Sequence, residues 1–185
     1  MTSSILLVCS TIVLVLACAA PSKNNTAAAP DSSSGMALAS AAFAAGESIP
    51  TRYTLYGENL TPDLTWDKAP EGTRSFALTC RDPDAPGGSF VHWVLFNMPE
   101  NVRALPEGMG RDSTLPFGGT QGTNSFHRVG YDGPRPPSGT HRYYFDLYAL
   151  DGMLELDMTA TAARLQQAMK GHVLAHASLM AKYKK

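Results

Sequence analysis

Two acidic side chains and a histidine lie close together in residues 82–92, which read DPDAPGGSFVH. A proline directly after Asp82 biases that residue toward an extended backbone, and the Ala85–Pro86 bond can be cis if it lies in a tight turn. The segment therefore predicts a stiff loop that holds Asp82 and Asp84 in place, followed by a strand that carries His92. Negative charge beside an imidazole raises its pKa, so we expect a raised pKa for His92.

A second polar cluster lies at residues 136–143, which read PPSGTHRY. His141 and Tyr143 are two residues apart, so they point to the same side of a strand. If this strand lies near the strand of His92, two imidazoles and a phenol converge with Asp82. The two clusters would then form one polar cup.

Such a cup, walled by Pro136 and Pro137, is suited to a small anion. Histidine and tyrosine side chains donate hydrogen bonds to phosphate or carboxylate, and an acid behind them keeps an imidazole oriented and charged. Each residue alone has an ordinary structural explanation: an aspartate in a turn bonds its own backbone, and a histidine or tyrosine can fill a core. The occurrence of both clusters in one chain is what favours an anion site.

Other chemistries have less support in the sequence. His172 and His176 are four residues apart, as in zinc sites on helices, but the glutamate of His-Glu-x-x-His is missing. No Gly-x-Ser-x-Gly elbow or phosphate-binding P-loop occurs. Cys80 stands in an apolar run and is expected to be a small buried side chain, not a nucleophile. We therefore expect neither a metal site nor a cofactor.

The composition is that of a globular domain. The chain has 185 residues, of which 44% are hydrophobic and 17% charged, and its formal net charge is -1. That length suffices for one domain with a buried core. No basic stripe occurs, so nothing in the sequence indicates nucleic-acid binding.

The N-terminal residues have the pattern of an export signal. Residues 5–17 are an apolar run that is short for a membrane span, and the run ends in VLAC at residues 15–18. This resembles a bacterial lipoprotein signal, with residues 1–17 removed and a lipid on Cys18; ordinary secretion and an uncleaved anchor are the alternatives. We expect an exported protein of the cell envelope, anchored to a membrane through Cys18.

A tether separates this signal from the folded domain. Residues 18–35 are mostly Ala, Ser, Pro and Asn and are predicted to be flexible. Residues 36–185 form the domain, in which Cys80 is the single cysteine, so no internal disulfide is expected.

Strand-forming residues dominate the middle of the domain. Segments 74–81, 90–98 and 141–150 are rich in β-branched and aromatic residues and are bounded by Pro, Gly and Asp. Segment 49–56 is a further candidate strand. Strict alternation along 90–98 places one set of side chains on a common face: Phe90, His92, Val94, Phe96 and Met98.

The C-terminal region combines a helix with a strand. Residues 159–170 predict a short helix that is capped by Thr159 and ended by Gly171. Residues 172–183 alternate with a period of two, which favours a strand over a continuation of the helix. Residues 110–140, rich in Gly, Pro, Ser and Thr, predict a long ordered loop. The fold class is therefore mostly β, sandwich-like, with short helices and functional loops at one end.

The two polar clusters resemble those of a known family. The motifs DPDAP…VHWVLFNMP and GYDGPRPPSGTHRYYFDLYAL closely resemble the phosphatidylethanolamine-binding protein family, and most closely its bacterial branch of Raf-kinase-inhibitor-like proteins. The likeness extends over residues 43–183. It implies a central antiparallel sheet packed on a smaller sheet, short peripheral helices and an anion pocket at one end.

The resemblance also implies site residues. The family pocket accepts phosphate-like head groups, and in this chain it falls on Asp82, Asp84, His92, Pro136, Pro137, His141 and Tyr143. Eukaryotic members close the pocket with a C-terminal helix, whereas this chain is expected to end in a strand. Bacterial relatives suggest a homodimer as the assembly.

The leading interpretation is a binding protein without enzymatic activity, attached to the cell envelope, that holds a small anion or a phosphorylated head group. One alternative is an inhibitor of a protease or kinase that makes contact through residues 110–140. Another is a weak ester or phosphoester hydrolase in which Asp82 and His92 pair as a general base, although the sequence offers no evident activated nucleophile.

Overall fold

The structure is a computed structural model that describes Met1 and residues 35–185. The predicted signal peptide (1–17), tether (18–35) and lipidation site at Cys18 therefore lie outside the described residues, apart from Met1 and Gly35. Within the described part of the chain, no helix is both long enough and apolar enough to cross a membrane.

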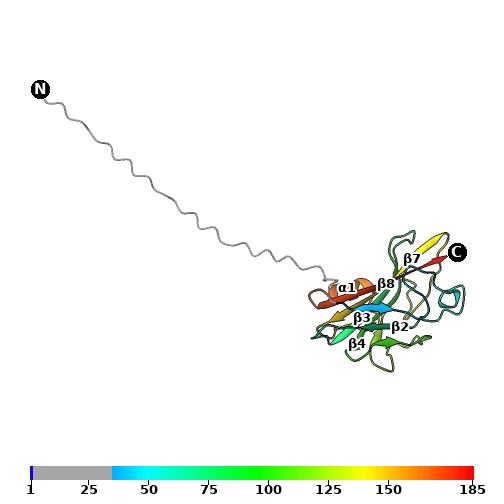
Figure 1. Ribbon diagram of the computed structural model, residues 1–185, viewed down its shortest axis with the longest axis horizontal. Coiled ribbons are helices and arrows are strands. Elements are labelled where there is room, and N and C mark those ends of the chain that lie inside the picture. Colours follow the sequence, from blue (N-terminus) through cyan, green and yellow to red (C-terminus); the bar gives the residue numbers. More distant parts are fainter. Residues whose placement is uncertain (2–34) are drawn as a thin grey trace.

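Two antiparallel sheets make up the domain, as Figure 1 shows. The larger sheet has the strand order β6-β4-β3-β7-β8, and the smaller has the order β1-β2-β5. The strands of the larger sheet are β3 (Ser75–Asp82), β4 (Phe90–Pro99), β6 (Thr120–Gln121), β7 (Thr140–Leu150) and β8 (Val173–Lys184). Those of the smaller sheet are β1 (Ala37–Ala39), β2 (Leu64–Asp67) and β5 (Ala104–Leu105). The predicted fold class, a central antiparallel sheet packed on a smaller one, is confirmed.

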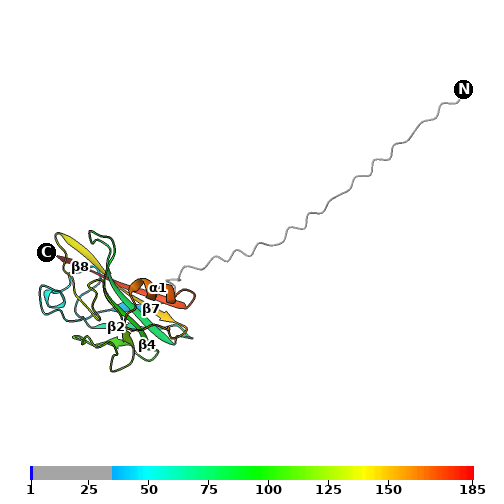
Figure 2. The ribbon, with the colours of Figure 1, turned by 180° about the vertical axis from the view of Figure 1, so that it is seen from behind.

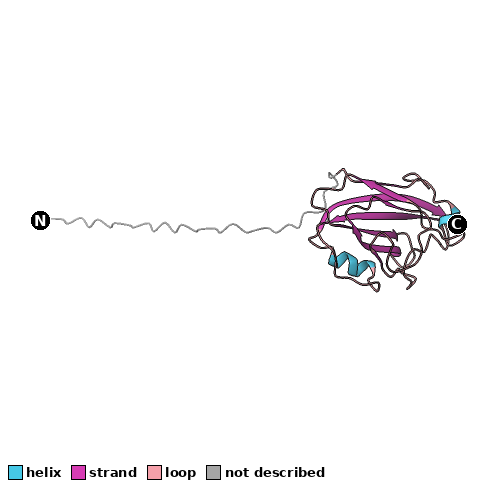
Figure 3. Cartoon of the chain, turned by 90° about the horizontal axis from the view of Figure 1, so that it is seen from below, coloured by secondary structure: helices cyan, strands magenta, loops and turns pink. Residues whose placement is uncertain are grey.

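The main core lies between the two sheets. Leu38 and Trp66 of the smaller sheet pack in one cluster with Phe76, Leu78 and Phe145 of the larger. The opposite face of the larger sheet carries a second core beneath the helix α1 (Ala162–Ala168). Figure 3 shows this helix on one side of the strands, which gives the domain three layers.

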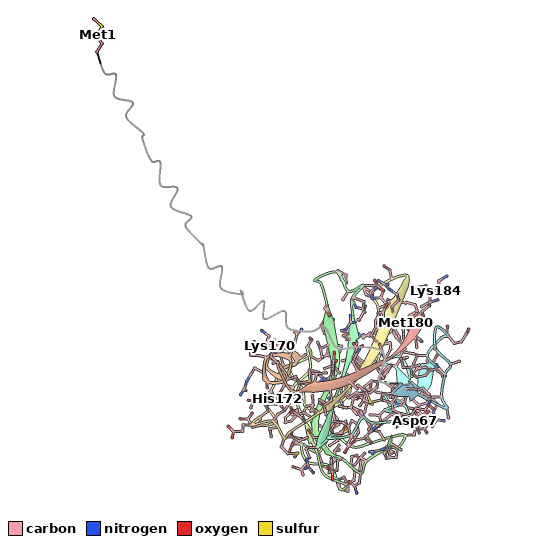
Figure 4. The ribbon with its side chains drawn as sticks, turned by 60° about the vertical axis from the view of Figure 1, so that its left-hand side comes forward. Met1, Asp67, Lys170, His172, Met180 and Lys184 are labelled. Carbon is pink, nitrogen blue, oxygen red and sulfur yellow. The ribbon has the colours of Figure 1, made fainter. Side chains whose placement is uncertain are left out.

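The long predicted strands are confirmed. Segments 74–81, 90–98, 141–150 and 172–183 correspond to β3, β4, β7 and β8. Along β8 every second residue is buried because its side chain enters the core, while the intervening residues are more exposed. In Figure 4 this strand crosses the molecule from His172, directly before its start, past Met180 to Lys184. Figure 2 shows the domain of Figure 1 from behind.

The C-terminal helix is shorter than predicted, and its cap differs. Thr161, not Thr159, is the N-cap, and its side chain accepts a hydrogen bond from the backbone N–H of Arg164. Thr159 is held in the preceding turn, where its N–H and hydroxyl both donate to the Asp157 carboxylate. The predicted stop holds, because Gly171 has a φ of 82°, in the left-handed region that suits glycine.

The predicted strand at 49–56 is wrong. Residues Thr51–Tyr53 form a 3-10 helix, since Pro50 directs the chain into a tight turn in which Tyr53 N–H donates to the Pro50 carbonyl. Of residues 49–56, only Ile49 bonds to the edge strand β8, where its N–H donates to the Lys182 carbonyl at 2.7 Å. The other residues of the segment therefore have no strand to pair with.

A bulge in β4 changes the direction of His92. Where β3 advances by one residue, from Cys80 to Arg81, β4 advances by two, and His92 is the extra residue. A bulge re-aims side chains and increases local twist. Trp93 enters the core between the sheets, and the His92 ring lies on that same side, against Tyr143 of β7.

A second bulge lies near Asn97, whose φ is 58°. As a result Val94 and Phe96 pack in the core beneath α1, but Met98 packs in the core between the sheets. The predicted common face of residues 90–98 is therefore wrong, since strict alternation fails at both bulges.

The proline-rich segment before β7 is packed tightly against the 3-10 helix. A Cβ added to Gly133 would lie 2.1 Å from the Tyr53 carbonyl oxygen. The contact is fixed by Leu55 N–H, which donates to the Pro134 carbonyl, and by Gly133 N–H, which donates to the Asn59 side chain.

We predict that Gly133→Ala lowers the free energy of unfolding by about 1–3 kcal/mol, because the new methyl group overpacks this contact. Chemical denaturation measures the change. Gly152→Ala is the matched control, since a Cβ there meets nothing within 4 Å. Equal stability of the two variants would contradict the close approach.

Candidate functional site

Asp82 and His141 meet at one end of the larger sheet. Asp82 ends β3, and His141 lies at the start of the neighbouring strand β7. His141 Nδ1 lies 2.7 Å from Asp82 Oδ2, and both side chains are buried. A buried carboxylate needs hydrogen-bond donors to compensate for lost hydration, and here the Asp84 backbone N–H also donates to Asp82 Oδ1. The predicted meeting of the two sequence clusters is confirmed.

His92 is held by a different partner. Its Nδ1 lies 2.6 Å from the backbone carbonyl oxygen of Asp132, and the Asp132 N–H in turn donates to the His92 carbonyl. The ring contacts those of Phe90, Phe126 and Tyr143, with centroids 5.2 to 5.8 Å away. The Asp82–His92 pair that the hydrolase alternative required is therefore replaced by Asp82–His141.

The expected raised pKa of His92 is wrong. Burial among aromatic rings lowers the pKa of His92, because desolvation penalises the imidazolium. The hydrogen bond to the Asp132 carbonyl and the charge of Asp82 act in the opposite direction but do not outweigh burial. His92 is thus a neutral ring at neutral pH.

Tyr143 lies behind these groups and is fully buried. Burial raises the pKa of its phenol, and the nearby Asp82 carboxylate raises it further. Within the described residues its hydroxyl has no hydrogen-bond partner. Tyr143 therefore backs the site and is not among the residues that line the cavity described next.

A cavity of about 200 Å³ opens beside the two histidines. Besides Asp82 and His141, three of the predicted residues line it, namely His92, Pro136 and Pro137, and the structure adds others. The full lining is Asp82, Ala85, Pro86, Phe90, His92, Phe126, Arg135, Pro136, Pro137 and His141. No described peptide bond is cis, so Ala85–Pro86 is trans and the cis bond that the sequence allowed is absent.

Arg135 lines the cavity but is not among the residues that the sequence predicted. It lines the cavity from an exposed position, and within residues 35–185 no ion pair or side-chain hydrogen bond occupies its guanidinium. The signal was present in the motif GPRPP, where a cation stands between prolines that form the wall. An unpaired guanidinium at a cavity rim is suited to oxyanions.

A second buried carboxylate organises the wall. Asp132 is completely buried and accepts hydrogen bonds from Asn124, at 2.7 Å, and Arg111, at 2.9 Å. Arg128 lies 2.8 Å from its other oxygen. This cluster fixes the backbone carbonyl that holds His92, so Asp132 positions the ring without lining the cavity.

Asp84 faces away from the cavity. Both carboxylate oxygens bind the Arg142 side chain, at 2.7 and 2.9 Å, and the Arg142 backbone N–H donates as well. These bonds lower the pKa of Asp84 from 3.8 to about 2. The residue fastens the loop after β3 to the start of β7, and it does not line the cavity.

The remaining candidates have other surroundings. His172 pairs with Asp151, and His176 lies 3.1 Å from Asp146, so the two histidines do not converge on one site. Within the described residues no group of three or more potential ligands could hold a metal ion.

A larger cavity of about 320 Å³ is mostly apolar and has no histidine. It is lined by Pro106, Met109, Gly110, Asp112, Leu115, Pro116 and Phe117.

Comparison with known proteins gives consistent matches. A sequence model of the family described as phosphatidylethanolamine-binding protein matches residues 39–184. The UPF0098 protein of Methanothermobacter thermautotrophicus is 46% identical over 150 residues, covering 81% of this chain and 99% of its own. The UPF0098 protein YbhB of Escherichia coli is 41% identical over 157 residues, covering 80% and 99%.

Solved structures agree with these sequence matches. The crystal structure of CT736 from Chlamydia trachomatis, a phosphatidylethanolamine-binding protein homolog, has a TM-score of 0.76 and 37% identity, covering 83% of this chain and 99% of its own. The crystal structure of E. coli YbcL, described as a member of the mammalian PEBP family, has a TM-score of 0.77 and 35% identity, covering 81% and 98%.

We predict that Arg142→Gln raises the pKa of Asp84 from about 2 toward 3.8. Because the folded-state pKa is the depressed one, the pair stabilises the fold above the unfolded-state pKa and loses this effect as the pH falls toward 2. NMR titration of the Asp84 carboxyl carbon measures the shift. Arg164→Gln, which alters a surface ion pair with Asp157, should leave Asp84 unchanged; an unshifted Asp84 in Arg142→Gln would refute the assignment.

Proposed function

Because the chain belongs to the phosphatidylethanolamine-binding protein family, we propose that it is a binding protein for a small oxyanion, such as free phosphate or the phosphate of a lipid head group. The ligand occupies the cavity lined by Asp82, His92, Arg135 and His141. The observation that carries the proposal is the unpaired guanidinium of Arg135 beside two oriented imidazoles.

Arg135 supplies the fixed positive charge that an anion in this cavity requires. Asp82 contributes a buried negative charge and His92 is neutral at neutral pH. Without Arg135 an entering anion would therefore meet the Asp82 carboxylate with no fixed positive charge to offset it. A guanidinium stays protonated at all physiological pH values and can bind two oxyanion oxygens at once.

The size of the cavity limits the ligand. About 200 Å³ is below the range of roughly 300–1,000 Å³ that is typical of sites for drug-sized molecules. A phosphate or phosphoethanolamine group has few heavy atoms and suits such a volume. The acyl chains of an intact phospholipid would have to stay outside, so we propose recognition of the head group alone.

Binding has more support than hydrolysis. The described lining residues include no Ser, Thr, Cys or Lys that could act as a nucleophile, and Asp82 orients His141 in place of His92. Inhibition of a protease or kinase through residues 110–140 also has less support, because Phe126, Arg135 and the two prolines of that segment form the cavity wall.

We also propose that the protein is exported and held at the cell envelope by a lipid on Cys18. The support is the apolar run at 5–17 followed by VLAC. A membrane-tethered domain would meet phosphorylated head groups at high local concentration. Mass spectrometry of the mature N-terminus tests this: a diacylated Cys18 is expected, and a mature chain that retains residues 1–17 without lipid would contradict it.

We predict that phosphate and phosphoethanolamine bind the purified domain in calorimetry, and that Arg135→Gln weakens both about tenfold, because one charge-assisted interaction is lost. Arg74→Gln is the matched control: it makes the same change of charge at the residue before β3, at the opposite end of that strand from Asp82. Absence of binding at millimolar ligand, or equal effects of the two variants, would count against the site.

A further inference from the structure

We propose that the cavity selects oxyanions that carry a proton, such as the monoanion of a phosphate monoester, over isosteric oxyanions that carry none. The selecting residue is His92. This inference rests on the proposed oxyanion site and specifies which form of the ligand the site accepts.

The tautomer of His92 follows from its hydrogen bond. A carbonyl oxygen can only accept, so at 2.6 Å from the Asp132 carbonyl the Nδ1 atom must carry a hydrogen. The remaining ring nitrogen, Nε2, is then the atom that His92 can offer to a ligand in the cavity it lines. In a neutral ring that nitrogen is an acceptor.

The surroundings keep the ring neutral. His92 is 3% exposed, and rings of Phe90, Phe126 and Tyr143 surround it. The charged groups that act on it are Asp82 from β3 and Asp132 from the wall segment. Arg135 and His141 line the same cavity. The two carboxylates favour an imidazolium, but burial among the aromatic rings outweighs them and lowers the pKa of His92.

Two groups of opposite character therefore face one small ligand. Arg135 donates hydrogen bonds and needs an anion, whereas His92 Nε2 accepts and needs a hydrogen. A phosphate monoester monoanion satisfies both: unprotonated oxygens face the guanidinium, and its P–OH donates to Nε2. An oxyanion without a hydrogen would place its lone pairs against the lone pair of Nε2, which leaves both unpaired.

Methyl phosphate and methyl sulfate are the probes that separate these cases. Near pH 5.5 methyl phosphate is mainly the monoanion, since the second pKa of a phosphate monoester is about 6. An NMR titration of the His92 ring establishes its charge at this pH, and an imidazolium there would also overturn the inference. Methyl sulfate has the same shape and the same charge but no proton. We expect methyl phosphate to bind at least about tenfold more tightly in calorimetry at this pH.

His92→Asn tests the assigned atom. The asparagine amide can still donate to the Asp132 carbonyl but has no counterpart of Nε2. Affinity for methyl phosphate is expected to fall about tenfold. Affinity for methyl sulfate is not expected to fall, because the lone pair that opposes this ligand is removed. A thermal unfolding curve for each protein establishes that the variant is folded, and the comparison of the two ligands on the unmodified protein stands without the variant.

The outcomes are distinguishable. Equal affinity of the unmodified protein for the two ligands overturns the inference but leaves the oxyanion site in place. Failure of both ligands and of phosphate to bind overturns the proposed function as well. An equal loss of both ligands in a folded His92→Asn protein would show that His92 only supports the wall, which also overturns the inference.

Discussion

The buried hydrogen bond between Asp82 and His141 is the interaction on which the cavity depends. It joins the end of β3 to the start of β7, two strands that pair along the centre of the larger sheet. A carboxylate removed from water must be satisfied by donors, so the loop after β3 turns back and supplies the Asp84 N–H. Outside the cavity, the Asp84–Arg142 ion pair fastens the same loop to β7. The floor of the site is therefore held from both of its sides.

The wall of the cavity is also held in place by a buried carboxylate, that of Asp132. Asp132 gathers Arg111, Arg128 and Asn124 around its side chain and presents its backbone carbonyl to His92. Each histidine of the cavity thus has its Nδ1 atom fixed by an oxygen acceptor, one from a side chain and the other from the backbone. Side chains fixed in this way lose little conformational entropy when a ligand arrives, which is the advantage of a preorganised site.

The bulge at His92 directs this side chain of the sheet toward the cavity. In a regular strand His92 and Trp93 would point to opposite faces. The extra residue lets Trp93 fill the core between the sheets while His92 turns to the cavity on the same side. Bulges occur preferentially next to functional sites because they re-aim single side chains without breaking the sheet, and the proposed anion site lies at this end of β4.

The sequence by itself determined the long strands, the short helix with its glycine stop and the two polar clusters, because periodicity, glycine and proline act over a few residues. It also identified Asp82, His92 and His141, which line one cavity, and the resemblance to the family predicted the two sheets. Only the tertiary structure decided the rest. It paired Asp82 with His141, turned Asp84 outward, brought Arg135 to the rim and lowered the pKa of His92. Partners 40 to 60 residues apart and the burial of a ring depend on how strands pair and where they bulge, and neither follows from local pattern.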